Sequence, residues 1–405
     1  MRVLRLAGVS EVSQTKNSQF FGSLESLRGI AALLVAAYHA AWVHPLYTVG
    51  VVRNGYLMVD FFFVLSGFVI CHSYGRKIRD GLEFLRFILL RLGRLYPLHL
   101  ATLLFFLALE FLKFLKNHYG GHVGLHPAFA ENDGLAFLLN LALLQSVGIL
   151  KNSTFNAPSW SIGVEFWTYI LFALVCLYLG SGIRRVAAAC LLVTASFAAL
   201  MLFGQHSLSV DNHYALARCI LGFFIGVLTH EVFSRRSDRT TTRARNPTLV
   251  GIAQVAVVLV IVGFLSASLR RVMTDYLALP LFAATVLLFA TDAKTVLSRL
   301  LNTRALAYLG RTSYSIYMVH FGVMTIVLNV MLALVHKRTL NIDHELAPDA
   351  GPLVGLLVLA GYLGLVVWIS GYTFRWIEAP FREKTKAMVA RRFGSPKVVA
   401  EPGLP

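Results

Sequence analysis

Apolar runs long enough to cross a lipid bilayer recur along the whole chain. A bilayer core of about 30 Å needs about 20 helical residues, and eleven runs reach or approach that length. The runs are 28–44, 56–74, 95–115, 134–150, 160–180, 186–204, 214–233, 248–267, 273–290, 314–336 and 353–374. Only 14% of the residues are charged, against about 25% in soluble proteins. These features exclude a soluble enzyme, a disordered chain and a disulfide scaffold, and they predict an all-α integral membrane protein.

The basic residues indicate how the helices cross the membrane. The chain has 37 Lys+Arg against 20 Asp+Glu, a formal charge of +17, and basic residues gather in cytoplasmic loops. If the run at 134–150 lies at the outer surface or re-enters instead of crossing, 28 of the 37 basic residues fall on the cytoplasmic side. The sequence therefore predicts ten transmembrane helices with both termini cytoplasmic. We expect no nucleic-acid partner. In a chain this apolar, the excess of basic residues is explained by their placement in cytoplasmic loops.

The chain divides into one large membrane domain and two short ends. Residues 1–25 are polar and lack the apolar core of a signal peptide, so we expect a cytoplasmic N-terminal segment. The transmembrane domain is predicted over 26–382, and 383–405 is predicted to be a basic, disordered cytoplasmic tail. The four cysteines lie in apolar segments without a CxxC pair, so we expect packing residues and no metal site. The outer histidines His118, His122 and His126 likewise form no recognisable metal motif.

Ionisable groups inside the predicted spans are candidates for function. His39 follows Arg28 by eleven residues, which places both on one face of the first helix, about 16.5 Å apart along its axis. Arg28 would lie at the cytoplasmic boundary and His39 near mid-depth. A cation at the cytoplasmic mouth and an imidazole at mid-depth on one helix face indicate a channel-like site. A His39 that only packs against a neighbouring helix and hydrogen-bonds to it is an equal alternative.

Two carboxylates lie one turn inside their spans on the outer side. Asp60 is in VDFFFVLSGF and Glu165 is in SWSIGVEF, and either could orient a histidine and fix its tautomer. Hydrogen bonding between helices is the alternative for each. Arg218 is a candidate for binding an anionic acceptor or for pairing with a carboxylate. Acceptor contacts are also predicted for the residues that precede Glu165, namely Ser159, Trp160 and Ser161.

Arg91 and Arg94 share one face at the cytoplasmic start of the third span, at the level of Arg28. Arginine forks suit phosphate oxygens. Together with a histidine at mid-depth, this pattern favours transfer of a group from a cytoplasmic, phosphate-bearing donor to an acceptor from the outer side. Two further groups are weaker candidates: His320, expected nearer the cytoplasmic side, and Glu110, expected to reach water.

Six sequence blocks occur in order between about Leu24 and Arg382. They are SLRGIAALLVAAYHA (26–40), GYLMVDFFFVLSGFVI (55–70), RFILLRLGRLYPLHL (86–100), SWSIGVEFWTY (159–169), LGRTSYSIYMVHF (309–321) and WIEAPFR (376–382). Together they resemble the membrane acyltransferase-3 family, which O-acylates carbohydrates and related hydroxyl compounds. The chain resembles the stand-alone form, without the SGNH-hydrolase-like domain of some members.

The resemblance implies roles for individual residues. His39 matches the proposed catalytic histidine and would act as general base, with Arg28 as its motif partner. Arg91 and Arg94 match the Arg-x-x-Arg pair assigned to the acyl donor. Glu165 and Asp60 match acidic positions of the family blocks.

The resemblance also implies an enzyme that transfers an acyl group, foremost acetyl, from cytoplasmic acyl-CoA to a surface or secreted glycan. It implies no permanently bound cofactor, a multi-pass location in a bacterial inner membrane, and completion of transfer with or without a separate periplasmic partner. The sequence leaves the acceptor, the acylated position and the acyl length open. A secondary transporter or exporter is the alternative, although the chain lacks paired Gly/Pro-interrupted segments in its two halves.

Overall fold

The structure is a computed structural model that describes most of the chain. It covers residues 21–120, 127–203, 208, 214–239, 246–267, 273–290, 295–335, 339–342 and 345–394. The predicted outer histidines His122 and His126 lie outside these ranges. So does the end of the predicted tail, from residue 395 onward.

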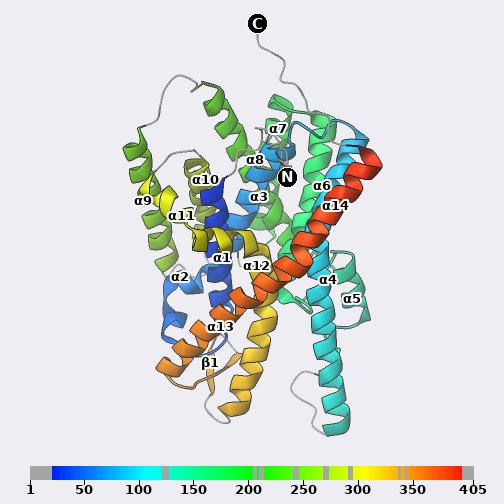
Figure 1. Ribbon diagram of the computed structural model, residues 1–405, viewed down its shortest axis with the longest axis vertical. Helices are drawn as coiled ribbons and strands as arrows, with labels where there is room; N and C mark the ends of the chain where they lie inside the picture. Colours follow the sequence, from blue (N-terminus) through cyan, green and yellow to red (C-terminus); the bar gives the residue numbers. More distant parts are fainter. Residues whose placement is uncertain are drawn as a thin grey trace, which may run out of the picture.

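Helices make up nearly all of the described chain (Figure 1). The α-helices are α1 (Gly22–Tyr38), α2 (Gly50–Arg53), α3 (Met58–Tyr74), α4 (Gly81–Gly120), α5 (Gly134–Leu141), α6 (Trp160–Leu179), α7 (Ile183–Leu202), α8 (Ala215–Arg239), α9 (Pro247–Ser266), α10 (Ala278–Phe289), α11 (Val296–Leu301), α12 (Arg304–Leu334), α13 (Pro352–Thr373) and α14 (Ala379–Phe393). Short 3-10 turns are η1 (Pro45–Thr48), η2 (Gly55–Leu57), η3 (Ala157–Ser159) and η4 (Met273–Leu277), and η5 (Phe374–Glu378) is a π-helical turn. A small antiparallel hairpin, β1 (Thr339–Ile342) and β2 (Glu345–Pro348), separates α12 from α13.

The described helices confirm an all-α membrane architecture. Eight are long and apolar enough to cross a bilayer: those beginning at Gly55, Gly81, Ala157, Ile183, Ala215, Pro247, Arg304 and Pro352. Two shorter helices occupy the other predicted spans: α1, with 17 residues, and the apolar stretch Thr274–Phe289. The structure thus has a helix at each of the ten predicted crossings. The number that cross, and the side on which the termini lie, remain predictions.

The segment predicted not to cross contains only a short helix. Eight residues of α5 rise about 12 Å, well short of a bilayer core. The Asp133 carboxylate caps the helix by accepting the backbone N–H of Ala136. Tyr96 and His99 of α4 contact the carbonyl oxygens of Leu141 and Asn140, at 3.0 and 2.9 Å. The segment therefore lies against the side of α4, as Figure 1 shows.

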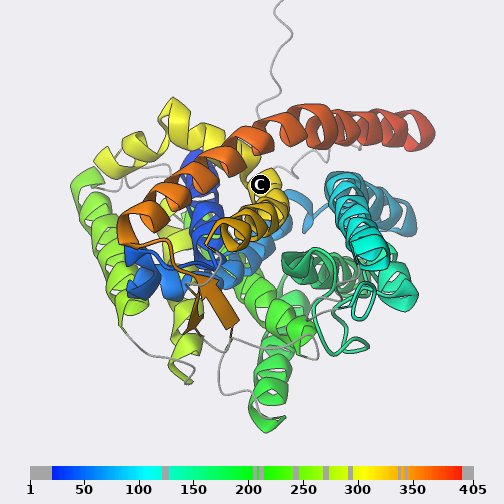
Figure 2. The same ribbon diagram turned by 90° about the horizontal axis from the view of Figure 1, so that it is seen from below.

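Several boundaries differ from the prediction. The helix α1 ends at Tyr38, six residues before the predicted end of the first span, so His39 lies just past the helix instead of inside it. The helix α4 begins fourteen residues before the predicted span and continues through Pro97, so Arg91 and Arg94 lie well inside a helix rather than at its start. The helix α12 begins ten residues early, at Arg304. The expectation of a disordered tail after Arg382 is wrong as far as Phe393, because α14 continues from α13 and η5 as one oblique band. In Figure 1 this band crosses α12 obliquely, and α14 packs against α4; Figure 2 shows the same band from below. Polar residues extend each helix past its apolar run because helix geometry does not require apolar side chains.

The helices α1 and α12 pack closely, with glycine at the contact. A Cβ on Gly29 would lie 2.5 Å from the backbone carbon of Leu309, and a Cβ on Gly310 would lie 2.5 Å from the carbonyl oxygen of Glu25. Small residues that let two backbones approach are a usual device in membrane helices. The two helices run parallel in register, so residues ten positions after Gly29 and Gly310 also meet. Those residues are His39 and His320.

Candidate active site

A cavity opens between α1, α3, α4, α6 and α12. It holds about 770 Å³ of space not filled by atoms, including open solvent at its mouth. Five of the residues singled out from the sequence line it: Arg28, Arg91, Arg94, Ser161 and Glu165. Residues of α3, from Val59 to Ile70, supply much of its apolar wall. The cavity thus combines a polar, cationic part with an apolar wall.

The three cavity arginines make few interactions with the protein. Arg28 donates to Ser313 Oγ at 2.7 Å and to the carbonyl of Gly310 at 3.2 Å. Arg91 donates to the Tyr74 hydroxyl at 3.0 Å. Arg94 makes neither a hydrogen bond nor an ion pair within the part of the chain that the structure describes. None of the three forms an ion pair with a carboxylate there, although the buried Glu378 and the cavity residue Glu165 attract Arg94 at longer range. The cavity can therefore offer guanidinium N–H donors to an anion.

Glu165 is the carboxylate of the cavity, and it is held by hydroxyl groups. Its Oε1 accepts from Ser66 Oγ and from the Tyr169 hydroxyl, both at 2.6 Å. Ser66 and Tyr169 are themselves 2.8 Å apart. With three cations and one anion in its lining, the cavity has a net positive charge, which favours an anionic ligand.

Asp60 faces away from this cavity toward α8, where it pairs with Arg218. Arg218 Nε donates to Oδ1 of Asp60 at 2.9 Å, and Nη2 donates to Oδ2 at 2.7 Å. Trp160 covers the guanidinium, with its ring centroid 5.2 Å away. Of the two roles open to Arg218, pairing with a carboxylate is therefore the one that the geometry displays.

Ser161 and Tyr317 both line the cavity and contact each other. The Ser161 and Tyr317 hydroxyls lie 2.7 Å apart, and Tyr317 also donates to the carbonyl of Pro158 at 3.0 Å. Ser159 does not line the cavity; it is buried, and its carbonyl accepts from Gln145 at 2.9 Å. Beyond Tyr317 lies His320, whose ring centroid is 5.7 Å from that of Tyr317.

His39 lies just past the end of α1 and contacts His320. Its Nδ1 is 2.9 Å from the carbonyl oxygen of Val35 and 3.3 Å from Nε2 of His320. The contact with His320 agrees with the alternative in which His39 packs against a neighbouring helix. A functional role for the half-buried His39 stays a prediction. Neither Asp60 nor Glu165 hydrogen-bonds to it. The expectation that one of these carboxylates orients His39 is not met, because their oxygens are engaged by Arg218 or by Ser66 and Tyr169.

His320 was expected nearer the cytoplasmic side than His39, and this was wrong. The early start of α12 places His320 in the middle of that helix, where it is fully buried at the level of His39. A signal was present in the sequence. Ser313, Tyr317 and His320 follow the i, i+4, i+7 spacing of one helix face, and all three polar side chains lie on the side toward the site.

Glu110 does not simply reach water. Its Oε2 accepts the backbone N–H of Phe129 at 3.0 Å, and its Oε1 accepts from Asn132 at 2.8 Å. It therefore holds the chain that leads into α5.

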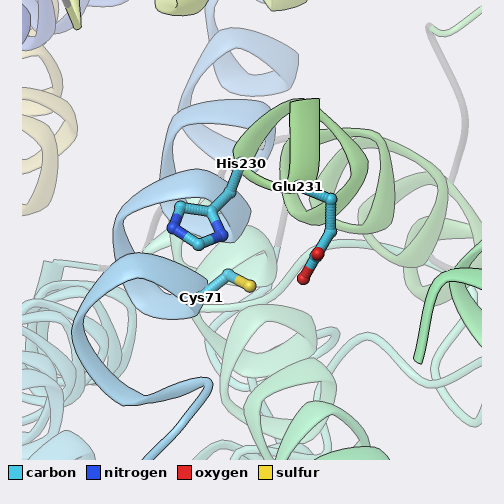
Figure 3. Close-up of side chains that lie close together, drawn as sticks. All are labelled: Cys71, His230 and Glu231. Atoms are coloured by element: carbon cyan, nitrogen blue, oxygen red, sulfur yellow. The ribbon is translucent and has the colours of Figure 1, made fainter. Parts of the chain in front are cut away.

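A second polar cluster joins Cys71 of α3 to His230 and Glu231 of α8 (Figure 3). Their ligand atoms lie within 4.8 Å of one another, a spacing compatible with a metal ion. However, Arg185 donates to Oε1 of Glu231 through both Nε, at 3.0 Å, and Nη2, at 2.5 Å. The guanidinium already supplies the positive charge that this carboxylate needs, so we assign no metal to the cluster.

Comparisons with known proteins give a consistent result. The sequence profile described as "Acyltransferase domain" matches residues 21–375. A protein from Komagataeibacter xylinus, the putative membrane-bound transacylase BcsY, is 24% identical over 387 residues, 93% of this chain and 87% of its own. The protein 2 in picA locus of Rhizobium radiobacter is 33% identical over 170 residues, 40% of this chain and 85% of its own.

A third relative carries a more specific name. The putative peptidoglycan O-acetyltransferase YrhL of Bacillus subtilis is 23% identical over 334 residues, which are 77% of this chain and 50% of that protein. No solved structure matches the chain.

Proposed function

The chain belongs to the acyltransferase-3 family and is an acyl-transferring membrane enzyme, and from this premise we propose that it moves an acyl group from acyl-CoA to a carbohydrate hydroxyl. The donor is acetyl-CoA in the first instance, and the acceptor is a surface or secreted glycan. The observation that carries the proposal is the set of three arginines around one cavity, none of which forms an ion pair with a carboxylate among the described residues.

The arginines suit the phosphate groups of CoA. Arg28 and Arg91 have spare N–H donors, and Arg94 has all of its donors free within the described chain. Guanidinium forks bind phosphate oxygens through paired hydrogen bonds. The apolar stretch of the cavity, lined by Val59, Leu65 and Ile162, would accept the pantetheine arm and a short acyl chain.

His39 is the proposed general base. It lies about 16.5 Å from Arg28 along α1, so a donor anchored at the arginines needs a long arm to bring its thioester to the histidine. Tyr317 and Phe62, whose rings are 5.8 Å apart, both line the cavity, and Tyr317 also contacts His320. In this proposal these two side chains line the passage for the acyl group.

The chemical step needs one proton acceptor. The acceptor hydroxyl oxygen attacks the thioester carbonyl carbon while Nε2 of His39 takes the hydroxyl proton. The C–S bond then breaks, and the CoA thiolate leaves and recovers the proton from His39. Glu165 fixes Ser66 and Tyr169 at the cavity wall, and Asp60 with Arg218 holds α3 against α8.

Two features of the setting complete the proposal. The location is the inner membrane of a bacterium, with the arginine end of the cavity on the cytoplasmic side. Glycans enter from the opposite side, near Ser161 and Trp160.

The test uses purified protein in lipid vesicles with radiolabelled acetyl-CoA and a glycan fraction from cells that lack the protein. Covalent label in the glycan supports the proposal. Label that crosses the vesicle membrane without covalent transfer would instead support a transporter, and no label in the glycan from any acyl-CoA would refute the proposed reaction.

A further inference from the structure

The two facing imidazoles, His39 and His320, have partners that restrict where their protons lie. His320 Nδ1 lies 2.6 Å from the carbonyl oxygen of Tyr317. A carbonyl oxygen only accepts hydrogen bonds, so Nδ1 of His320 carries the proton. In the neutral ring, Nε2 of His320 is then an acceptor, and it points at His39.

The same argument assigns the tautomer of His39. Its Nδ1 faces two acceptors, the carbonyl oxygen of Val35 at 2.9 Å and Nε2 of His320 at 3.3 Å. A proton on Nδ1 satisfies both through a shared hydrogen bond, whereas a lone pair there would face two other lone pairs. The remaining nitrogen, Nε2 of His39, keeps its lone pair, and it has no hydrogen-bond partner within the part of the chain that the structure describes.

The surroundings keep His320 in this position. Its side chain is fully buried. The Tyr362 hydroxyl of α13 contacts the carbonyl oxygens of both Ala36 and His320, at 3.1 and 3.3 Å, and so ties α1 to α12 at this level. The close contact at Gly29 and Gly310 fixes the same register ten residues earlier.

We propose that His320 is a positioning residue that accepts the Nδ1–H of His39, so that Nε2 of His39 is the free base and its protonated form is stabilised. This inference rests on the proposed acyl transfer for its chemical meaning. The role resembles that of the third member of a catalytic triad, here supplied by a neutral imidazole in place of a carboxylate. When His39 takes the acceptor proton, its Nδ1–H bond to His320 becomes charge-assisted and stronger.

Two amide variants separate this role from simple packing. In His320→Asn the short amide reaches the Tyr317 carbonyl, in place of Nδ1, but does not reach His39. In His320→Gln the longer amide can present its oxygen where Nε2 of His320 lies. Both variants replace the ring with a polar group, so a loss caused only by packing would affect them alike.

The first measurement is acetyl transfer in vesicles, from acetyl-CoA to the glycan fraction. Loss of a hydrogen bond to a charged group corresponds to a decrease of about 10- to 100-fold. We expect kcat to fall by about this factor in His320→Asn, with the KM for acetyl-CoA within about twofold of wild type. His320→Gln should recover most of kcat.

The second measurement does not depend on acyl transfer. Diethyl pyrocarbonate modifies neutral imidazole nitrogens, and peptide mass spectrometry reports its rate of reaction at His39 in the full-length protein. We expect slower modification of His39 in His320→Asn and a nearly wild-type rate in His320→Gln. Equal rates in wild type and His320→Asn, or equal losses in both variants, would overturn the inference. If wild-type protein transfers no acetyl group, the proposed function fails, and the labelling alone decides whether His320 controls His39.

Discussion

Asp60 and Arg218 form a bidentate ion pair in the middle of the bundle, with the carboxylate fully buried and the guanidinium 3% exposed. The pair joins α3 to α8, where a Cβ on Gly67 would lie 1.8 Å from the carbonyl oxygen of Phe223. The burial of both side chains shields the two charges from water. The pair is therefore expected to hold the scaffold of the cavity in place rather than to take part in proton transfer.

Removing one member of this pair should destabilise the protein. Arg218→Met leaves a buried carboxylate without a partner, and such changes cost about 3–5 kcal/mol. The double variant Asp60→Asn/Arg218→Met removes both charges and should recover part of the loss. Thermal unfolding of the purified protein in detergent measures the effect, with Arg311→Met, at an exposed position on α12, as the control. A double variant that is less stable than Arg218→Met would contradict the assignment.

The free guanidinium of Arg94 should contribute directly to donor binding. We expect Arg94→Gln to raise the KM for acetyl-CoA by about 10- to 100-fold, the usual effect of losing hydrogen bonds to a charged group. Arg79→Gln makes the same change of charge at an exposed position outside the cavity and should change KM by less than about twofold. If Arg94→Gln and Arg79→Gln raised KM equally, Arg94 would act only through the general positive charge of the protein and not through direct contact with the donor.

The close contact between α1 and α12 should be intolerant of a side chain. Gly29→Val places its Cβ against the backbone of Leu309 and should lower the melting temperature together with acyl transfer. Gly361→Val adds the same atoms on α13, where nothing lies within 4 Å of the new Cβ. That control should keep wild-type stability and activity. A Gly29→Val protein with unchanged stability would show that the two helices are not packed as described.

The cluster of Cys71, His230 and Glu231 should not need a metal. Treatment with a strong chelator is expected to leave the melting temperature unchanged, whereas Arg185→Gln, which unpairs Glu231, should lower it. Elemental analysis of the purified protein gives an independent reading. One equivalent of zinc, lost with chelator together with stability, would contradict the role given to Arg185.

Which residues share a face of one helix could be predicted from the sequence. The eleven-residue spacing of Arg28 and His39 and the three-residue spacing of Arg91 and Arg94 follow from helix geometry alone. The structure adds that all three arginines line one cavity. The short α5 likewise agrees with a segment that the distribution of basic residues had marked as unable to cross.

Which side chains of two different helices contact each other was harder to predict. The pairing of Asp60 with Arg218 and of His39 with His320 depends on the register in which two helices pack. That register is set by close backbone contacts, such as Gly29 with Gly310, whose partners no single-chain spacing reveals. The ends of α4 and α12 were also misjudged, because polar residues continue a helix beyond its apolar run. The error at α12 displaced His320 from the level of His39.

The central claim is that Nε2 of His39 accepts the proton of the attacking hydroxyl. The most direct test compares His39→Gln with His118→Gln, a change at an exposed histidine near the end of α4. Acetyl transfer in vesicles and acetyl-CoA binding are measured on the same preparations. General base catalysis typically contributes about 10²- to 10⁴-fold, so His39→Gln should lose transfer by at least about 100-fold while its affinity for acetyl-CoA stays unchanged, and His118→Gln should match wild type. Transfer within a few fold of wild type in His39→Gln would contradict the claim.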